Sequence, residues 1–210
     1  SRKSTIEVAQ SFEQIAGLNA KFAETAEGLS AVSSAAITLS KASKESLESS
    51  STSLVGIMNQ FDLAADQADR TVNVLAAGTA VGASSIAQSA EAYKNFGTVA
   101  KGANITLEQS QALIQVLGKK SLFAGEAGNK LKGSVLQLQK AGLGYKSGQF
   151  DINDALTDAN KLMGRLKTAK QKDALATKLF GAENITAGKI LLENIPLFNE
   201  FTKGVTNTTL

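Results

Sequence analysis

Apolar residues recur along this chain at intervals of three and four positions, the spacing that places side chains on one face of an α-helix. No stretch combines strict apolar–polar alternation with the β-branched residues typical of strands. The 210 residues include a single proline, and alanine, the strongest helix former, is the commonest residue. The pattern therefore predicts an all-α fold, a multi-helix bundle without a sheet of three or more strands.

Glycines and helix-capping pairs predict where the individual helices begin and end. Pairs with capping-box spacing are Ser4 with Glu7, Ser85 with Gln88, Thr106 with Gln109, and Thr168 with Gln171. The predicted helices are 5–27, 29–42, 46–60, 64–77, 84–101, 106–118, 125–140, 152–166, 169–180, 184–194 and 197–203. Gly142, Gly144 and Gly148 interrupt the pattern around Tyr145 and predict a loop before Asp151.

The first predicted helix carries a second signal, because its apolar residues alternate four- and three-residue steps as in a coiled coil. The seam consists of Val8, Phe12, Ile15, Asn19, Phe22, Ala26 and Leu29. Two interpretations stay open. Either the helix self-associates as a coiled coil, or it is an ordinary amphipathic helix packed on the rest of the domain.

A weak internal repeat relates two segments about 60 residues apart. The run that begins with Ser46-Leu47-Glu48 resembles the one that begins with Thr106-Leu107-Glu108, and each continues through a capped helix, an apolar turn and a second helix. This similarity predicts stacked helical hairpins, since one hairpin cannot bury its own apolar face.

Composition removes most catalytic mechanisms. The chain has no Cys and no His, so thiol nucleophiles, thiolate metal sites and Ser–His or Cys–His mechanisms are excluded. Asp151, Asn153 and Asp154 lack the glycine and glutamate of a calcium loop and are better interpreted as a helix cap. We therefore predict no enzyme activity, no catalytic, cofactor-binding or metal-binding residues, and no cofactor.

Charge and hydropathy bear on the remaining partners. The balance of 22 Lys and Arg against 19 Asp and Glu predicts no specific nucleic-acid binding and only weak, salt-sensitive contact with duplex DNA. Thr71–Ala90 is 20 residues long without a charge, about the length of a membrane span. Its glycines and small polar residues favour two helices joined by a turn, with a membrane-inserting or pore-forming module as the alternative function, beside a helical adaptor bundle.

Residues 75–138 resemble the core domain of phage tail tape-measure proteins, and the resemblance extends more loosely over about residues 40–205. The matching motifs are Leu75-Ala76-Ala77, Gly97-Thr98-Val99-Ala100, Thr106-Leu107-Glu108, Ala127-Gly128-Asn129-Lys130-Leu131-Lys132 and Val135-Leu136. Lys178-Leu179-Phe180-Gly181 is similar to the Ile-Phe-Gly ending of the family. Ser121 departs from the family, which usually has glycine there, and Lys132 replaces the usual arginine.

The resemblance implies a structural protein of a phage or prophage tail that acts in tail assembly and length determination. Its implied partners are the tail tube protein, tail-assembly chaperones and tail-tip proteins, and its implied location is the virion tail, after assembly in the host cytoplasm. Self-association is a further expectation, and membrane contact is expected only for a full-length protein. The family motif carries no catalytic or binding residue. We therefore expect the important residues to be packing residues, namely Leu75, Phe96, Leu107, Leu117, Leu131 and Phe180.

Pattern and resemblance together predict three segments. Residues 1–42 form N-terminal helices, as a coiled coil or linker; residues 43–205 form the core helical domain; and residues 206–210 form a tail.

Overall fold

A computed structural model describes residues 5–207 of the chain, with side chains from residue 8 onward. This part of the chain contains eleven α-helices, three short 3₁₀ helices and one hairpin of two-residue strands, which confirms the predicted all-α fold. The α-helices are α1 (Thr5–Leu18), α2 (Ala26–Ser43), α3 (Leu47–Gln60), α4 (Ala68–Val81), α5 (Ile86–Gly102), α6 (Leu107–Gly118), α7 (Ala124–Lys140), α8 (Ile152–Gly164), α9 (Ala169–Phe180), α10 (Ile185–Glu193) and α11 (Ile195–Asn207). The 3₁₀ helices are η1 (Ala20–Ala23), η2 (Ala65–Gln67) and η3 (Ala182–Asn184), and the strands are β1 (Tyr145–Lys146) and β2 (Gln149–Phe150).

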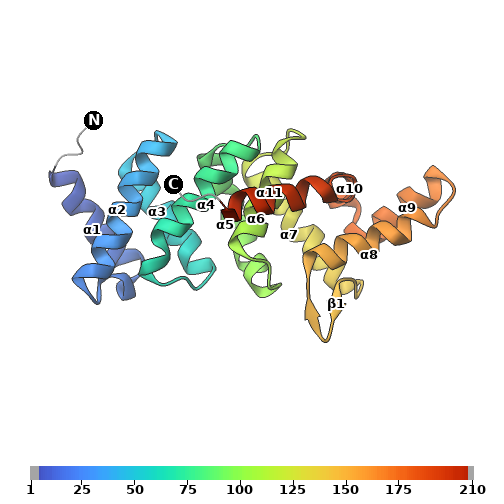
Figure 1. The fold of residues 1–210 in the computed structure, drawn as a ribbon, viewed down its shortest axis with the longest axis horizontal. Helices are drawn as coiled ribbons and strands as arrows, with labels where there is room; N and C mark the ends of the chain where they lie inside the picture. The colour runs from blue at the N-terminus through green and yellow to red at the C-terminus, as the bar shows by residue number, and fades with distance from the viewer. Residues whose placement is uncertain (1–4, 208–210) are drawn as a thin grey trace.

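The helices follow one another along the long axis of the molecule (Figure 1). Helix α1 lies at one end and α9 at the other, while α11 turns back and packs across α6 and α4. A continuous cluster of buried apolar residues extends from Ile15 to Val205. The chain therefore forms an elongated helical array with one core, closed along its middle by its last helix.

Helix α6 is the centre of this core. Every residue from Leu107 to Gly118 except Gln109 is buried, because α4, α5, α7, α10 and α11 surround the helix. The buried residues include two glutamines, Gln111 and Gln115, as well as the apolar Leu113, Ile114 and Leu117. Polar side chains that are buried in this way are costly unless they form hydrogen bonds.

The most extensive helix–helix contact joins α5 to α7, and a glycine makes it close. A Cβ atom built on Gly128 would collide with the backbone of Ala92. The absence of a side chain at this position therefore lets the two backbones approach each other.

Four helices end with the same kind of hydrogen bond, in which an N–H beyond the helix donates to a carbonyl five residues earlier in its last turn. The donor and acceptor pairs are Leu63 to Met58, Ile105 to Ala100, Leu122 to Leu117, and Leu143 to Leu138, at 2.9–3.2 Å. The residue before each donor has a left-handed backbone, with φ of 54° at Asp62, 55° at Asn104, 62° at Ser121 and 71° at Gly142. Ser121 thus adopts the conformation that the family usually gives to glycine.

The predicted continuous helix over 5–27 is wrong, since α1 ends at Leu18. The Asn19 side chain accepts a hydrogen bond from the N–H of Lys21 and caps η1, and Thr25 caps α2 through the N–H of Gly28. These local caps stop the helix where the heptad spacing would extend it. The seam residues Ile15 and Phe22 are buried in the core, so an uninterrupted coiled-coil seam does not form.

The segment predicted as a plain loop between Gly142 and Asp151 instead contains the β1–β2 hairpin. Tyr145 pairs with Phe150 and Lys146 with Gln149. The connecting residues Ser147 and Gly148 both have positive φ, as the tightest hairpin turn requires.

The capping boxes at Ser85, Thr106 and Thr168 are confirmed, whereas the pair Ser4 and Glu7 lies outside the described residues and side chains. Helix α11 continues through Asn207, farther than the predicted end at 203, and residues 208–210 lie outside the described part.

Candidate functional site

The six residues expected to carry packing are all in the core. Leu75, Phe96, Leu117, Leu131 and Phe180 are fully buried, and Leu107 is 2% exposed. These residues lie on five helices, α4, α5, α6, α7 and α9. Their burial confirms the core assignment made from the sequence, and it places the apolar side chains between helices rather than on a contact surface.

A buried polar network joins α6 to the link between α4 and α5, and sequence reasoning missed it. The Gln115 amide nitrogen donates to the Ser84 carbonyl at 3.0 Å, and its amide oxygen accepts from the Ser84 N–H at 2.8 Å. The Gln111 and Gln115 amides also donate to the Ser89 hydroxyl, at 3.1 and 3.2 Å. Glutamine therefore supplies in the core the hydrogen bonds that a solvent-exposed link would make with water.

Glycines on α4 and after it provide the space for these side chains. A Cβ atom at Gly78 would overlap the Gln111 side chain, and one at Gly82 would overlap that of Gln115. The sequence signal is two glutamines four residues apart on α6 and two glycines four residues apart at the end of α4, the second being its C-cap. Either pair alone is typical of a helix surface, which is why the network is not evident from the sequence.

An ion pair and a tyrosine secure the other side of α6. Arg70 donates through Nε and Nη2 to one carboxylate oxygen of Glu108, at 2.9 and 2.6 Å. The Tyr93 hydroxyl donates to the Leu107 carbonyl at 3.0 Å. Burial, with a smaller effect of the nearby Glu108 charge, holds the pKa of Tyr93 well above its usual value, so this tyrosine stays a neutral donor.

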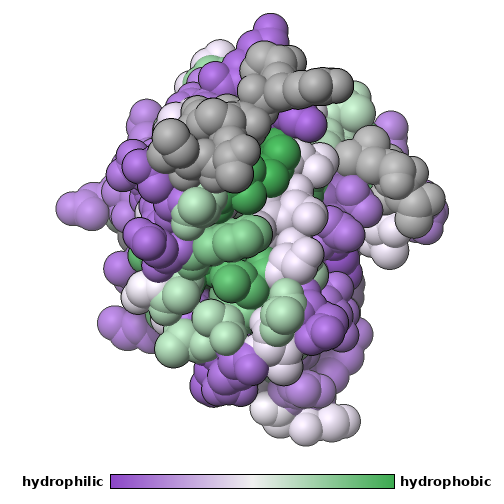
Figure 2. All heavy atoms as spheres, turned by 90° about the vertical axis from the view of Figure 1, so that its left-hand side faces the viewer, coloured by the Kyte–Doolittle hydropathy of each residue, from purple (hydrophilic) through white to green (hydrophobic). Residues whose placement is uncertain are grey.

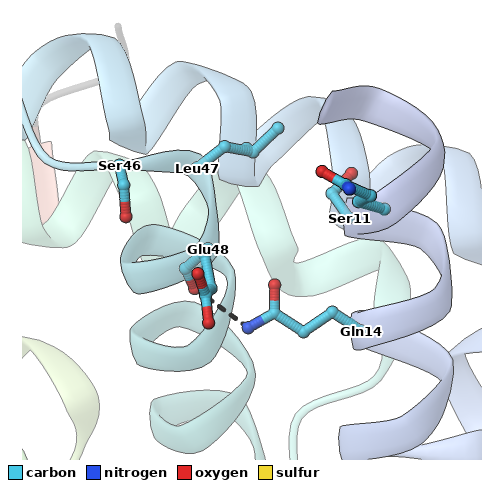
Figure 3. Close-up of a pocket in the computed structure, with 6 residues that line it drawn as sticks. Ser11, Gln14, Ser46, Leu47 and Glu48 are labelled. Atoms are coloured by element: carbon cyan, nitrogen blue, oxygen red, sulfur yellow. Dashed lines mark hydrogen bonds between the residues drawn. The ribbon is translucent and has the colours of Figure 1, made fainter. Parts of the chain in front are cut away.

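A pocket of about 440 Å³ opens between α1 and the start of α3 (Figure 3). Its lining is Gln10, Ser11, Gln14, Ser46, Leu47 and Glu48. Gln14 spans it, donating to the Glu48 carbonyl at 3.1 Å and to the Thr52 hydroxyl at 2.7 Å. Glu48 is the one titratable side chain among the described residues that line the pocket.

The acidic residues after the hairpin have structural partners. Asp151 caps α8 by accepting from the N–H of Asp154 at 2.9 Å, as the sequence predicts. The Asp154 carboxylate binds Lys146 at 2.6 Å, and this hydrogen bond raises the pKa of the lysine. Within residues 5–207, no group of three metal-ligating side chains is found.

The uncharged stretch Thr71–Ala90 is divided between α4 and α5, joined by residues 82–85, as the pattern of small residues predicts. Its residues Thr71, Val72 and Leu75 are buried. No helix in the described part of the chain combines the length and hydropathy needed to span a membrane.

The end of the molecule at α1 carries an apolar surface. Figure 2 shows apolar residues in a strip down the middle of this end, with hydrophilic residues around it. Helix α1 exposes Phe12 (36%) and Leu18 (41%), two of the four large apolar side chains that are exposed among the described residues. Apolar surface of this kind is typical of contact sites.

Comparison with known proteins gives two matches. Residues 1–181 match the family described as phage-related minor tail protein. The tape measure protein of Pneumococcus phage Dp-1 is 23% identical over 206 residues, which cover 92% of this chain and 18% of that protein. The chain thus spans less than a fifth of the length of this relative. No solved structure matches the chain.

Proposed function

Because the chain belongs to the family of phage-related minor tail proteins, we propose that it is a helical segment of a tape-measure protein that acts in tail assembly and helps to set tail length. The family gives the chain a structural role in a phage tail. The proposal of a role in tail assembly and tail length rests on the alignment of nearly the whole chain with one part of a tape measure protein.

The fold suits a role that depends on length. Helices α1 to α9 follow one another along the long axis and mostly contact helices one or two places away in the chain, whereas α10 and α11 pack back on α6 (Figure 1). Helices can be added to or removed from the ends of such an array while the packing around α6 is kept. The polar side chains of Gln111, Gln115 and Glu108 connect helices through hydrogen bonds and an ion pair, which suits a structural role.

The proposed partners are other tail components: the tube protein, the assembly chaperones and the tail-tip proteins. The apolar surface at α1, with Phe12 and Leu18, supports contacts beyond the segment itself, because exposed apolar side chains gain most from being covered. The proposed location is the virion tail.

An in-frame deletion of Thr71–Leu138 in the parent phage tests the proposal. The deletion removes α4 to most of α7, including the whole polar network. We expect short tails or no tails in electron micrographs. Wild-type tails with normal infectivity would overturn the tape-measure proposal for this segment.

A replacement variant separates length from specific contacts. The same 68 positions can be filled with an unrelated helical sequence of equal length. Tails of normal length would assign a spacing role to these residues, whereas absent tails would assign them contacts that assembly needs.

A further inference from the structure

The basic residues of the chain are concentrated at the end opposite α1. Residues 161–178 contain six Lys or Arg and one Asp, a net charge of +5, although the whole chain carries only +3. The remaining residues comprise 16 basic and 18 acidic side chains, or −2. The positive charge is therefore concentrated in one segment, although the total charge is small. Such an uneven distribution of charge is typical of proteins that bind polyanions.

Five of these cations have no acidic partner within the described residues. They are Arg165, Lys167, Lys170, Lys172 and Lys178, here called the basic corner, and all are exposed. The sixth basic residue of the segment, Lys161, pairs with Asp158, and five basic residues outside the segment form ion pairs within the described part of the chain. The one carboxylate inside the segment, Asp173, binds Lys189 of α10 and so does not offset the basic corner.

Two of these lysines lie where a positive charge lowers the stability of the folded protein. Lys170 and Lys172 lie in the first turn of α9, whose start at Ala169 has no acidic residue. The N-terminal end of a helix carries partial positive charge and favours anions, so cations there are unfavourable unless an anion is bound. In Figure 1, α9 projects from the end of the molecule, where a large ligand can reach it.

We propose that the basic corner binds the phosphate backbone of duplex DNA without sequence preference. Lysine and arginine side chains on an exposed helical corner can each neutralise one phosphate. Residues 161–178 contain no aromatic residue on which the bases of a single strand could stack. The same segment exposes no large apolar side chain of the kind that anchors a protein in a lipid surface.

Titration of the 210-residue chain into a fluorescent 20-base-pair duplex tests the proposal. With four or five phosphates neutralised, the slope of log K against log salt concentration is expected to be about −3.6 to −4.5. The variant K167Q/K170Q/K172Q should reduce the magnitude of this slope by about 2.7 and weaken binding most strongly at low salt. Changing the sequence of the duplex should leave the affinity unchanged.

A control of equal charge is available at the other end of the chain. Lys21, Lys41 and Lys44 are exposed and form no ion pair with any described residue. The variant K21Q/K41Q/K44Q also lowers the net charge from +3 to zero, and it should keep the wild-type slope. Equal losses in the two variants would overturn the proposal, because total charge rather than the basic corner would then control binding.

Stability and competing ligands complete the test. The corner variant should unfold at the same temperature as the wild type or higher, because it removes unfavourable cations from the start of α9. Preference for single-stranded DNA, binding to phosphatidylglycerol vesicles without binding to the duplex, or no duplex binding at 50 mM salt would each contradict the proposal.

Discussion

The Gln115 side chain and the Ser84 backbone form a closed pair of hydrogen bonds. The side-chain amide supplies the donor and the acceptor that backbone groups would supply in a helix or a sheet. Ser84 lies in the link between α4 and α5, and Gln115 is fully buried on α6. The pair therefore attaches the link between α4 and α5 to α6. It also gives hydrogen-bond partners to the buried N–H and carbonyl of Ser84.

Replacing Gln115 by Met keeps the side-chain length and removes both hydrogen bonds with Ser84, together with the one to the Ser89 hydroxyl. We expect the free energy of unfolding to fall by about 1–3 kcal/mol, because the Ser84 backbone groups stay buried without partners. Gln10, which is exposed on α1, provides the control, and Gln10→Met should change stability by less than about 0.5 kcal/mol. Denaturant titration of both variants measures the difference, and equal effects would show that the amide pair does not stabilise the fold.

Phe96 is fully buried on α5, as its place in the predicted core requires. Phe96→Ala should cost about 3–5 kcal/mol, through lost apolar burial and the cavity left behind. Leu136, 46% exposed on α7, gives the matched truncation, and Leu136→Ala should cost less than about 1 kcal/mol. A loss below about 1 kcal/mol for Phe96→Ala would mean that the ring is not in the core.

Two glycines in helices should respond to alanine in opposite directions. Gly128→Ala places a methyl group against the Ala92 backbone and should destabilise the protein by about 1–3 kcal/mol, since neither helix can move freely. Gly56→Ala has open space in the middle of α3 and should stabilise it by about 0.5–1 kcal/mol. Thermal unfolding of the two variants checks the sign. A Gly128→Ala protein that is as stable as the wild type would contradict the close contact between α5 and α7.

Ser121 and Gly142 occupy equivalent left-handed positions at the ends of α6 and α7. Ser121→Gly should raise stability by about 1 kcal/mol, because glycine adopts this conformation without steric cost. Gly142→Ser should lower stability by a similar amount, about 1 kcal/mol. Measured by denaturant titration, changes of the same sign in both variants would refute the equivalence of the two caps.

Local features of the sequence predict most helix boundaries. The capping boxes at Ser85, Thr106 and Thr168 are correct because a hydroxyl and a glutamine three residues later satisfy nearby N–H groups regardless of the tertiary fold. The break at Asn19 is missed because the apolar spacing continues through it while the side chain caps a new turn. The hairpin is missed because strands of two residues are too short to show alternation.

Features that depend on two distant segments are the ones that sequence reasoning could not reach. Gln111 and Gln115 are polar residues that the pattern assigns to a surface, and only the packing of Gly78 and Gly82 opposite them creates the buried site. The basic corner can be found by counting charges within residues 161–178, but the total charge of +3 gives no indication of it. Its exposure and lack of acidic partners follow from the way α8 and α9 project from the core.

The central claim, that this chain contributes length to a phage tail, is tested most directly by measuring tail length after an in-frame duplication of the 210-residue segment. An α-helix rises about 1.5 Å per residue, so a fully helical, extended copy would add at most about 300 Å. We predict tails that are longer by a uniform amount up to this limit, measured in electron micrographs of purified virions. Tails of wild-type length on infectious particles that contain the duplicated protein would contradict the claim.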